Sequence, residues 1–276
     1  MSTLYVVATP IGNLQDFSPR AQETLKQVDL IAAEDTRHSQ HLLNHFHITT
    51  PLYPLHEHNE KQAAQHLLQQ LQAGKNIALI SDAGTPLISD PGQHLLQLLH
   101  EHQLPIVAIP GPSALITALS VSGLPAGQFV FEGFLPAKPT TRQKRLSELV
   151  SETRTLVFYE APHRILDCLI DMSRIFGEER VVVLVKELTK VFETVYRANL
   201  HSTVVWLQEK TERQKGEFVV VVAGAQPIDN QQIDEETKKI FQTLKQHLPL
   251  KQAAKLTSEI TGVSKNVLYQ FGLHTD

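Results

Sequence analysis

Cysteine is almost absent from this chain of 276 residues: Cys168 stands alone, which excludes an internal disulfide and is typical of proteins from a reducing compartment. Apolar runs of membrane-spanning length are also missing. The short apolar segment at residues 4–8 has no basic flank before it and no long apolar core, so we do not expect a signal peptide. These absences predict a cytoplasmic protein with no membrane partner.

The chain also has no overall excess of positive charge. The net charge is −4, which argues against nucleic-acid binding through overall charge, and we expect no DNA partner. Histidine is common, with 14 residues, and His56 and His58 flank Glu57. However, no predicted helix or strand collects metal ligands on one face, so no metal site is predicted. Local basic segments stay compatible with RNA.

A dinucleotide-binding fingerprint, G-x-G-x-x-G, does not follow the first apolar segment, and the usual Rossmann-type methyltransferase pattern is also missing. Strand and helix patterns nevertheless alternate over residues 1 to about 120, with Gly- and Pro-rich loops after the apolar runs. This alternation predicts a sheet with a ligand crevice at the carboxyl ends of its strands. We therefore predict an α/β fold with two α/β domains, residues 1–122 and 123–225, and a small helical domain over residues 230–276.

The most constrained segment is residues 80–92. A buried strand, residues 77–80, is predicted to lead into it. Gly84 permits a positive φ and close approach of a ligand to the main chain. Asp90 and Pro91 match the N-cap and N1 pattern of a following helix. The segment is either a ligand-binding loop or a tight strand-to-helix connection that binds nothing.

Two charged segments are further candidates. Residues 34–37 are polar and follow a predicted strand, so they form either a site or a solvated loop with a helix cap. The segment 138–145 carries four basic residues and no acidic one until Glu148. It is either a phosphate-binding surface or an exposed helix start.

The last fifty residues have the pattern of a helix-turn-helix. Ala253, Ala254, Leu256 and Ile260 follow helical spacing, and Gly262 predicts a tight turn before a short final helix. These helices either dock RNA or only pack on the body of the protein or on a dimer mate.

A series of short motifs runs in order across nearly the whole chain: Ala8–Leu14, Ala33–Arg37, Ser81–Pro86 with Ser89–Gly92, Pro110–Ala114, Phe158–Arg164, Lys186–Lys190 and Gly216–Phe218. Together they resemble the tetrapyrrole-methylase superfamily, and within it the ribosomal RNA small subunit methyltransferase I group. The resemblance implies S-adenosylmethionine (SAM) in a cleft between two α/β domains, a homodimer, and 2′-O-methylation of a cytidine in the decoding region of 16S rRNA in the 30S subunit. Lys186 follows Val185 where an alanine-arginine pair is common, so a cationic role is kept and a guanidinium-specific one is not.

Methyl transfer from a sulfonium is an in-line displacement in which the enzyme chiefly positions the two partners, and a carboxylate can take the proton of a ribose hydroxyl. The catalytic candidates are Asp35, Asp90 and Glu160, although Asp90 can instead be only a helix cap and Glu160 can instead hold the amino group of methionine. The predicted SAM contacts are Pro10, Asp82, Ala83, Gly84, Pro86, Leu87, Ile88, Pro110, Ser113, Ala114 and Leu188. The predicted RNA contacts are Arg37, Lys138, Arg142, Lys144, Arg145, Arg164, Lys186, Lys251, Lys255 and Lys265.

Two other functions stay open at this point. A SAM-dependent C-methyltransferase acting on a tetrapyrrole or another small molecule is the fold's other main use. A non-enzymatic helix-turn-helix regulator is suggested by the C-terminal helices. Transfer of labelled methyl groups to rRNA, to a pigment or to neither would separate the three.

Overall fold

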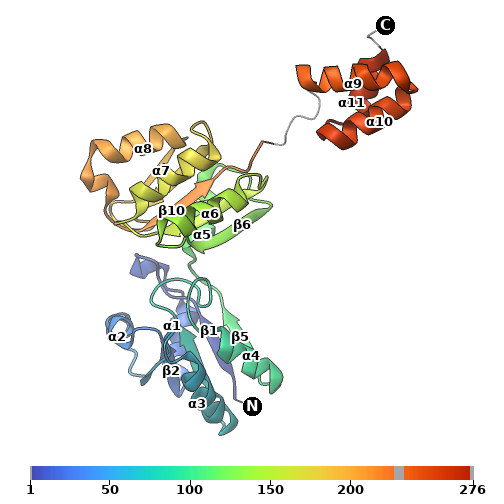
Figure 1. Cartoon of the computed structure of the whole chain (residues 1–276). Coiled ribbons are helices and arrows are strands. Elements are labelled where there is room, and N and C mark those ends of the chain that lie inside the picture. The colour runs from blue at the N-terminus through green and yellow to red at the C-terminus, as the bar shows by residue number, and fades with distance from the viewer. Residues whose placement is uncertain (1, 227–232, 274–276) are drawn as a thin grey trace. The chain divides into compact units, whose positions relative to one another are not determined.

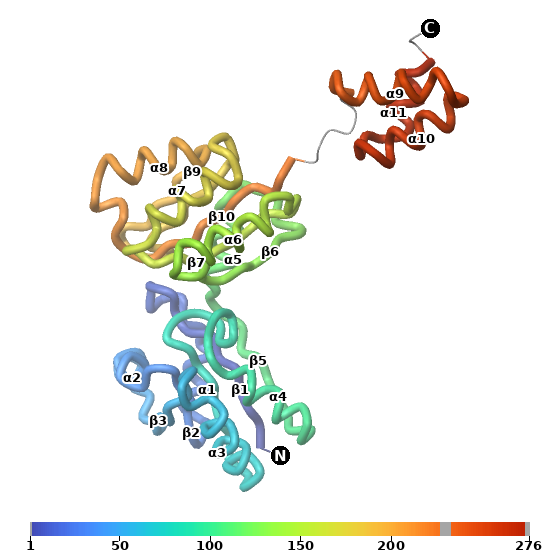
Figure 2. The backbone as a smooth tube through the Cα atoms, viewed as in Figure 1, coloured from blue at the N-terminus to red at the C-terminus, as the bar shows by residue number. Residues whose placement is uncertain are grey.

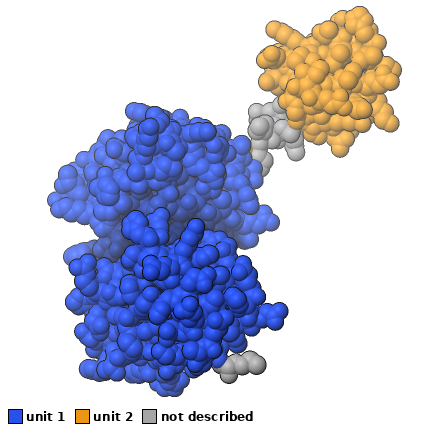
Figure 3. Space-filling view, turned by 60° about the horizontal axis from the view of Figure 1, so that its bottom comes forward, with its two compact units in different colours: residues 1–224 blue, residues 225–276 orange. Residues whose placement is uncertain are grey.

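The computed structural model describes residues 2–226 and 233–273 (Figure 1). The chain divides into two compact units, residues 1–224 and 225–276, which are described separately (Figure 3). The predicted start of the helical domain at residue 230 and its end at residue 276 lie outside the described residues. The predicted α/β fold with C-terminal helices is confirmed.

The first sheet is parallel and has the strand order β3-β2-β4-β1-β5. Its strands are β1 (Leu4–Val7), β2 (Leu30–Ala33), β3 (Leu52–Pro54), β4 (Ile77–Ile80) and β5 (Ile106–Ile109). Helices α1 (Pro19–Gln27) and α2 (Thr36–His45) pack on one face, and α3 (Glu60–Gln72) and α4 (Gln93–Glu101) pack on the other. A short 3₁₀ turn, η1 (Leu14–Asp16), precedes α1. Because the strands are parallel, their carboxyl ends and the loops that follow them meet at one edge.

The second sheet is mixed and has the order β6-β7-β10-β8-β9, in which only β6 and β7 are parallel. Its strands are β6 (Phe129–Phe134), β7 (Thr155–Glu160), β8 (Val181–Lys186), β9 (Thr194–Asn199) and β10 (Phe218–Val222). Helices α6 (Pro139–Leu149), α7 (Ile165–Phe176) and α8 (Leu200–Glu209) form a core with one face, and a 3₁₀ turn, η2 (Thr211–Gln214), follows them. The last strand, β10, lies at the centre and is buried along its whole length (Figure 2).

Helix α5 (Ala114–Ser122) covers the opposite face of the second sheet, although the sequence pattern placed it in the first domain. Its buried side chains Leu115, Ala118 and Leu119 pack with strands of the second sheet. Ile11, from the loop after β1, and Leu188, from the loop after β8, join the same cluster. Helix α5 thus ties the carboxyl edge of the first sheet to one face of the second.

The start of α4 differs from the prediction. Asp90 and Pro91 are not its N-cap and N1 residues, because the helix begins after Gly92, whose φ is 125°. The cap comes from α3 instead: Glu60 Oε1 accepts hydrogen bonds from the amides of Gly92 (3.0 Å) and His94 (2.9 Å). A carboxylate at a helix N-terminus is favourable wherever it comes from in the sequence. The side chain of Asp90 is therefore released from the role that the pattern gave it.

The second unit consists of α9 (Glu235–His247), α10 (Leu250–Thr261) and α11 (Lys265–Leu273) around a core of Phe241, Ala253, Ala254, Val263 and Leu268. The predicted turn is confirmed, since Gly262 ends α10 in the left-handed conformation with φ 76°. Leu256 and Ile260, by contrast, are 38% and 63% exposed. Within residues 2–226 and 233–273, no helix combines the length and apolar character needed to cross a bilayer.

Candidate functional site

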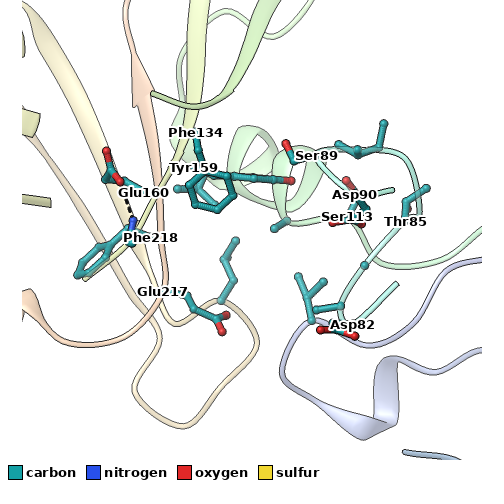
Figure 4. Close-up of a pocket in the computed structure, with 18 of the residues that line it drawn as sticks. Asp82, Thr85, Ser89, Asp90, Ser113, Phe134, Tyr159, Glu160, Glu217 and Phe218 are labelled. Carbon is teal, nitrogen blue, oxygen red and sulfur yellow. Dashed lines mark hydrogen bonds between the residues drawn. The ribbon is translucent and has the colours of Figure 1, made fainter. Parts of the chain in front are cut away.

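A cavity of about 460 Å³ lies where the carboxyl edge of the first sheet faces the second sheet (Figure 4). Loops after β1, β2, β4 and β5 contribute Ile11, Glu34, Asp82, Ala83, Gly84, Thr85, Ile88, Ser89, Asp90, Ser113 and Ala114. The second sheet and its loops contribute Phe134, Tyr159, Glu160, Ala161, Pro162, Val185, Leu188, Glu217, Phe218 and Val219. The volume is that of a site for a small molecule of cofactor size.

The loop after β4 is held in place by a two-way backbone pairing with the loop after β1. The amide of Thr9 donates to the carbonyl of Gly84 (2.8 Å), and the amide of Gly84 donates to the carbonyl of Thr9 (3.1 Å). Gly84 has φ 86°, and a Cβ there would lie 3.2 Å from Ile11 Cγ2. Gly84 therefore shapes the cavity, and its polar main-chain groups are engaged by Thr9 rather than presented to a ligand.

Most of the predicted SAM contacts line this cavity. Asp82, Ala83, Gly84, Ile88, Ser113, Ala114 and Leu188 do so, whereas Pro10, Pro86, Leu87 and Pro110 lie in the same loops without lining it. Leu87 and Ser89 have positive φ angles of 76° and 73°, which L-residues rarely adopt. The loop is thus held in an unusual backbone conformation, as is common for loops at functional sites.

Three carboxylates gather on the first-sheet side of the cavity. Burial, reinforced by the charges of Asp82 and Asp90, raises the pKa of Glu34 to about 7. Burial, together with the charge of Asp82, raises the pKa of Asp90 to about 6. Asp82 also ties two loops together, because its Oδ1 accepts from the amide of Asp35 (3.0 Å). In the parts of the chain that the structure describes, no group of three or more such side chains is arranged to hold a metal ion.

Asp35 has a different role from the one predicted. Its Oδ1 accepts from the amides of Arg37 (2.8 Å) and His38 (3.2 Å), so it caps α2, and these hydrogen bonds lower its pKa. It does not line the cavity. The neighbouring Glu34 does line it; Glu34 belongs to the candidate segment 34–37 but was not among the predicted catalytic residues. The side chain of Arg37 is 93% exposed, as an RNA contact requires.

Glu160 lines the cavity, but its carboxylate is already occupied. It accepts from its neighbour's amide, Ala161 N (2.8 Å), and from Arg164 Nη2 (3.2 Å), and it is only 3% exposed. Arg164 also donates to the carbonyl of Leu135. The structure thus contradicts an RNA-facing guanidinium at Arg164, because this side chain fixes Glu160 instead. The carboxylate of Glu160 is thus engaged by donors of its own domain rather than presented to a ligand.

The basic segment splits into buried and exposed members. The prediction for Arg142 is wrong: it is 4% exposed, and its Nε donates to Asp171 Oδ2 at 2.7 Å. Arg145 forms ion pairs with Glu132 and Glu148, both at 2.8 Å. These three carboxylates come from elsewhere in the second domain or from the next helical turn, so much of the positive charge is compensated locally.

The remaining predicted RNA contacts are lysines, and all of them except Lys186 are exposed. Lys138, Lys144, Lys251, Lys255 and Lys265 are exposed. Lys255 lies 3.7 Å from Glu259. Lys186 is half-buried, and its Nζ donates to the carbonyl of Glu212 (2.8 Å).

Comparison with known proteins assigns this architecture to a class. Residues 3–203 match the family described as Tetrapyrrole (Corrin/Porphyrin) Methylases, and residues 231–275 match the RsmI C-terminal HTH domain. The chain belongs to the tetrapyrrole methylase family.

Two relatives that match over nearly their full length carry the same name. Proteins named ribosomal RNA small subunit methyltransferase I are 52% identical in Xylella fastidiosa, over 97% of both chains, and 52% identical in Haemophilus influenzae, over 98% of this chain and 96% of the relative. Among solved structures, uroporphyrin-III C-methyl transferase from Thermus thermophilus complexed with S-adenyl homocysteine has a TM-score of 0.55 at 17% identity. That match covers 81% of this chain and 97% of the other, and it shows a shared fold.

Proposed function

We propose that this protein uses SAM to methylate the 2′-hydroxyl of a cytidine in the decoding region of 16S rRNA, with the assembled 30S subunit as its substrate. The observation that carries the proposal is the 52% identity, over 97% of the chain, to a protein named ribosomal RNA small subunit methyltransferase I. The match of residues 231–275 to the C-terminal domain of that group supports it further. A tetrapyrrole C-methyltransferase is the weaker alternative, because the solved structure named uroporphyrin-III C-methyl transferase is only 17% identical to this chain.

The residues of the cavity fit SAM. Ile88, Ala114, Leu188 and Val219 form an apolar wall suited to an adenosine. The carboxylates on the first-sheet side suit a ligand that carries a sulfonium and an ammonium charge, since opposite charges favour their ionised form. When bound, SAM supplies an electrophilic methyl group. The fit of charge and shape supports this cavity as the cofactor site.

Glu34 and Asp90 are the groups with the chemistry of a general base. Their raised pKa values of about 7 and 6 leave them ionised for much of the time near neutral pH, yet basic enough to accept a proton. The proton leaves the ribose 2′-oxygen and binds a carboxylate oxygen of this pair as the oxygen is methylated. Asp82, which raises both pKa values, tunes the pair.

The exposed lysines and the C-terminal helices are the proposed RNA contacts. Lys138 and Lys144 lie on α6, at its cap and in its second turn, and Lys251 and Lys265 lie on the helix-turn-helix unit. Lysines of this kind bind phosphate and position the RNA without reading its sequence. We also propose that the protein is cytoplasmic and, from the family resemblance, that it forms a homodimer; light scattering of the purified protein would test the homodimer.

The decisive experiment supplies tritiated SAM with three acceptors: 30S subunits from cells that lack this protein, the same rRNA stripped of ribosomal proteins, and a tetrapyrrole. We expect label in the rRNA of intact subunits. Digestion to nucleosides should then release the label as 2′-O-methylcytidine. Label in the pigment alone would reject the proposal, and label in a base rather than a ribose would reject its 2′-O part.

A further inference from the structure

Strand β6 contains a bulge next to the cavity. Its register with β7 pairs Phe131 with Val157 and Gly133 with Phe158, so two steps along β6 match one step along β7 and Glu132 is the extra residue. Gly133 has φ 64°, a conformation that favours glycine. β-Bulges bend a strand and redirect the side chains that follow them.

The bulge changes the face on which Phe134 stands. In a regular strand, residues three apart point to opposite faces. Phe131 and Phe134 are three apart, yet both rings contact Tyr159, with centroids 4.9 Å and 5.7 Å away and edge-to-face geometry. Glu132 therefore shifts the alternation by one, and Phe134 emerges on the face that lines the cavity.

Phe134 is 55% exposed although it has a packing partner. Its neighbour Tyr159 is fixed in turn, since its hydroxyl accepts from the amide of Leu115 (3.1 Å). Figure 4 shows Phe134 beside Tyr159, across the cavity from Asp82 and on the same side as Glu160. The flat apolar ring of Phe134 thus packs against Tyr159 and remains exposed on a wall of the cavity.

The bulge also faces the loop after β4. A Cβ on Gly133 would lie 3.0 Å from Ser89 Oγ, so the two segments meet closely. Ser89 precedes Asp90, one of the two carboxylates with a raised pKa. Burial raises the pKa of Tyr159 and the charge of Asp90 adds to the shift, which places the carboxylate near the aromatic pair. The exposed ring and the proton acceptor therefore belong to one small region.

We propose that Phe134 is a stacking platform for the nucleobase of the nucleotide that is methylated. This inference rests on the proposed function. RNA-binding proteins take bases out of the helical stack and place them on aromatic side chains, because every base has a π-face. Stacking of this kind is tolerant of sequence, so Phe134 positions the nucleotide and leaves the choice of base to other contacts.

The test replaces the ring and keeps the apolar volume. Phe134→Leu removes the flat face, Phe134→Tyr retains it, and Phe192→Leu is the matched control, since Phe192 is 76% exposed on the same domain and does not line the cavity. For each full-length protein, calorimetry gives the Kd for SAM, and methylation of 30S subunits gives KM and kcat. We expect Phe134→Leu to raise KM for the subunits about tenfold or more, as loss of one stacked base does. SAM affinity should stay unchanged, and Phe134→Tyr and Phe192→Leu should resemble the wild type.

Two results would overturn the stacking role while the wild type still methylates rRNA. One is an unchanged KM and kcat in Phe134→Leu. The other is a loss of SAM affinity equal to the loss of activity, which would place the ring against the cofactor. A wild-type protein that labels no rRNA would instead refute the proposed function, and the stacking role with it.

Discussion

The two walls of the cavity differ in whether their buried carboxylates are paired with a cation. On the first-sheet wall, Glu34 and Asp90 are partly buried and their pKa values are raised to about 7 and 6. On the second-sheet wall, the buried Glu160 is held by Arg164, and the rest of the surface is largely aromatic or aliphatic. A carboxylate that is paired with a cation is held in one position. A partly buried carboxylate without such a partner has a raised pKa and can exchange a proton near neutral pH. The first wall therefore has the groups suited to proton transfer, and the second has the surface suited to apolar recognition.

The largest effect on the first-sheet wall is expected from Gly84→Val, which should distort the loop after β4. A β-branched residue is strained at φ 86° and would press on Ile11, so we expect the folded protein to lose measurable SAM binding in calorimetry. Gly74→Val is the matched control, because Gly74 has φ 94° and a Cβ there meets none of the described residues within 4 Å. If both variants bind SAM equally well, the loop after β4 does not shape the cofactor site.

Removing one proton acceptor should be the next largest effect. Glu34→Gln is expected to lower kcat/KM by about 100-fold, at the low end of general base contributions. In the wild type, activity should fall as the pH drops through about 7, because protonation removes the base. The residual activity of Glu34→Gln should fall nearer pH 6, where Asp90 is protonated. Glu57→Gln, at an exposed position outside the cavity, should keep the wild-type pH profile. An unshifted acid limb in Glu34→Gln would exclude Glu34 as the base.

Deleting residues 230–276 tests whether recognition extends beyond both walls. The cavity lies wholly before residue 225, so SAM affinity should be retained. Methylation of rRNA should fall about tenfold or more, which is the loss of one or two charge-assisted contacts at about 1.5–3 kcal/mol each. A full-length variant with glutamate at Lys251, Lys255 and Lys265 should show a similar loss. Full activity of the truncated protein would mean that the C-terminal helices do not dock RNA.

A smaller effect is expected from the basic segment, where two of the four cations are already paired. Lys138→Glu with Lys144→Glu should weaken rRNA binding and reduce the slope of log Kd against log salt by about 0.7–0.9 for each lost phosphate contact. Lys26→Glu with Lys75→Glu gives the same change in net charge at exposed positions on the first domain. Equal slopes in the two double variants would show that Lys138 and Lys144 make no phosphate contact.

The smallest effect concerns stability. The folded-state pKa of Glu34 lies above its ordinary value of 4.5, so ionisation disfavours the fold fully above pH 7 and not at all below pH 4.5. Glu34→Gln should therefore raise Tm at pH 8 by about 2–4 °C, the shift for roughly 1 kcal/mol after a discount for partial solvent exposure. The gain should vanish near pH 4. A constant gain at both pH values would point to packing rather than charge.

Apolar runs bounded by Gly, Pro or Asn carried most of the fold prediction. The strand at residues 77–80 is found at the predicted bounds, because all four of its residues are buried and its apolar pattern is strong. Helix α8 was not predicted, since it continues directly from β9 without a Gly or Pro between them. The sheet assignment of α5 depends on contacts between distant segments, which no local pattern contains.

The loops that form the site were predicted from the sequence, but the residues in those loops that line the cavity were not always predicted correctly. The side chain of Asp90 lines the cavity because Glu60, thirty residues earlier, caps the N-terminus of α4, which is the role predicted for Asp90. Arg142 looked free because its partner Asp171 lies on another helix. For Glu34 a signal was present: it comes directly after a buried strand, whereas Asp35 stands immediately before the helix, at the position of a cap. Phe134 depends on a bulge, which the sequence marks only by Gly133.

The place of β10 has a consequence for biosynthesis. The first sheet is complete once residue 109 has been made, and it can form while the rest of the chain is still being synthesised. The second sheet must wait, because its central strand, residues 218–222, is the last of its strands to be made. Until then the β6-β7 and β8-β9 pairs keep open edges where β10 will insert, and open edges invite pairing with other chains. A nascent chain that stops short of residue 222 should therefore carry a finished first sheet joined to an aggregation-prone half-sheet, and a chaperone that binds exposed strand edges would act in this interval.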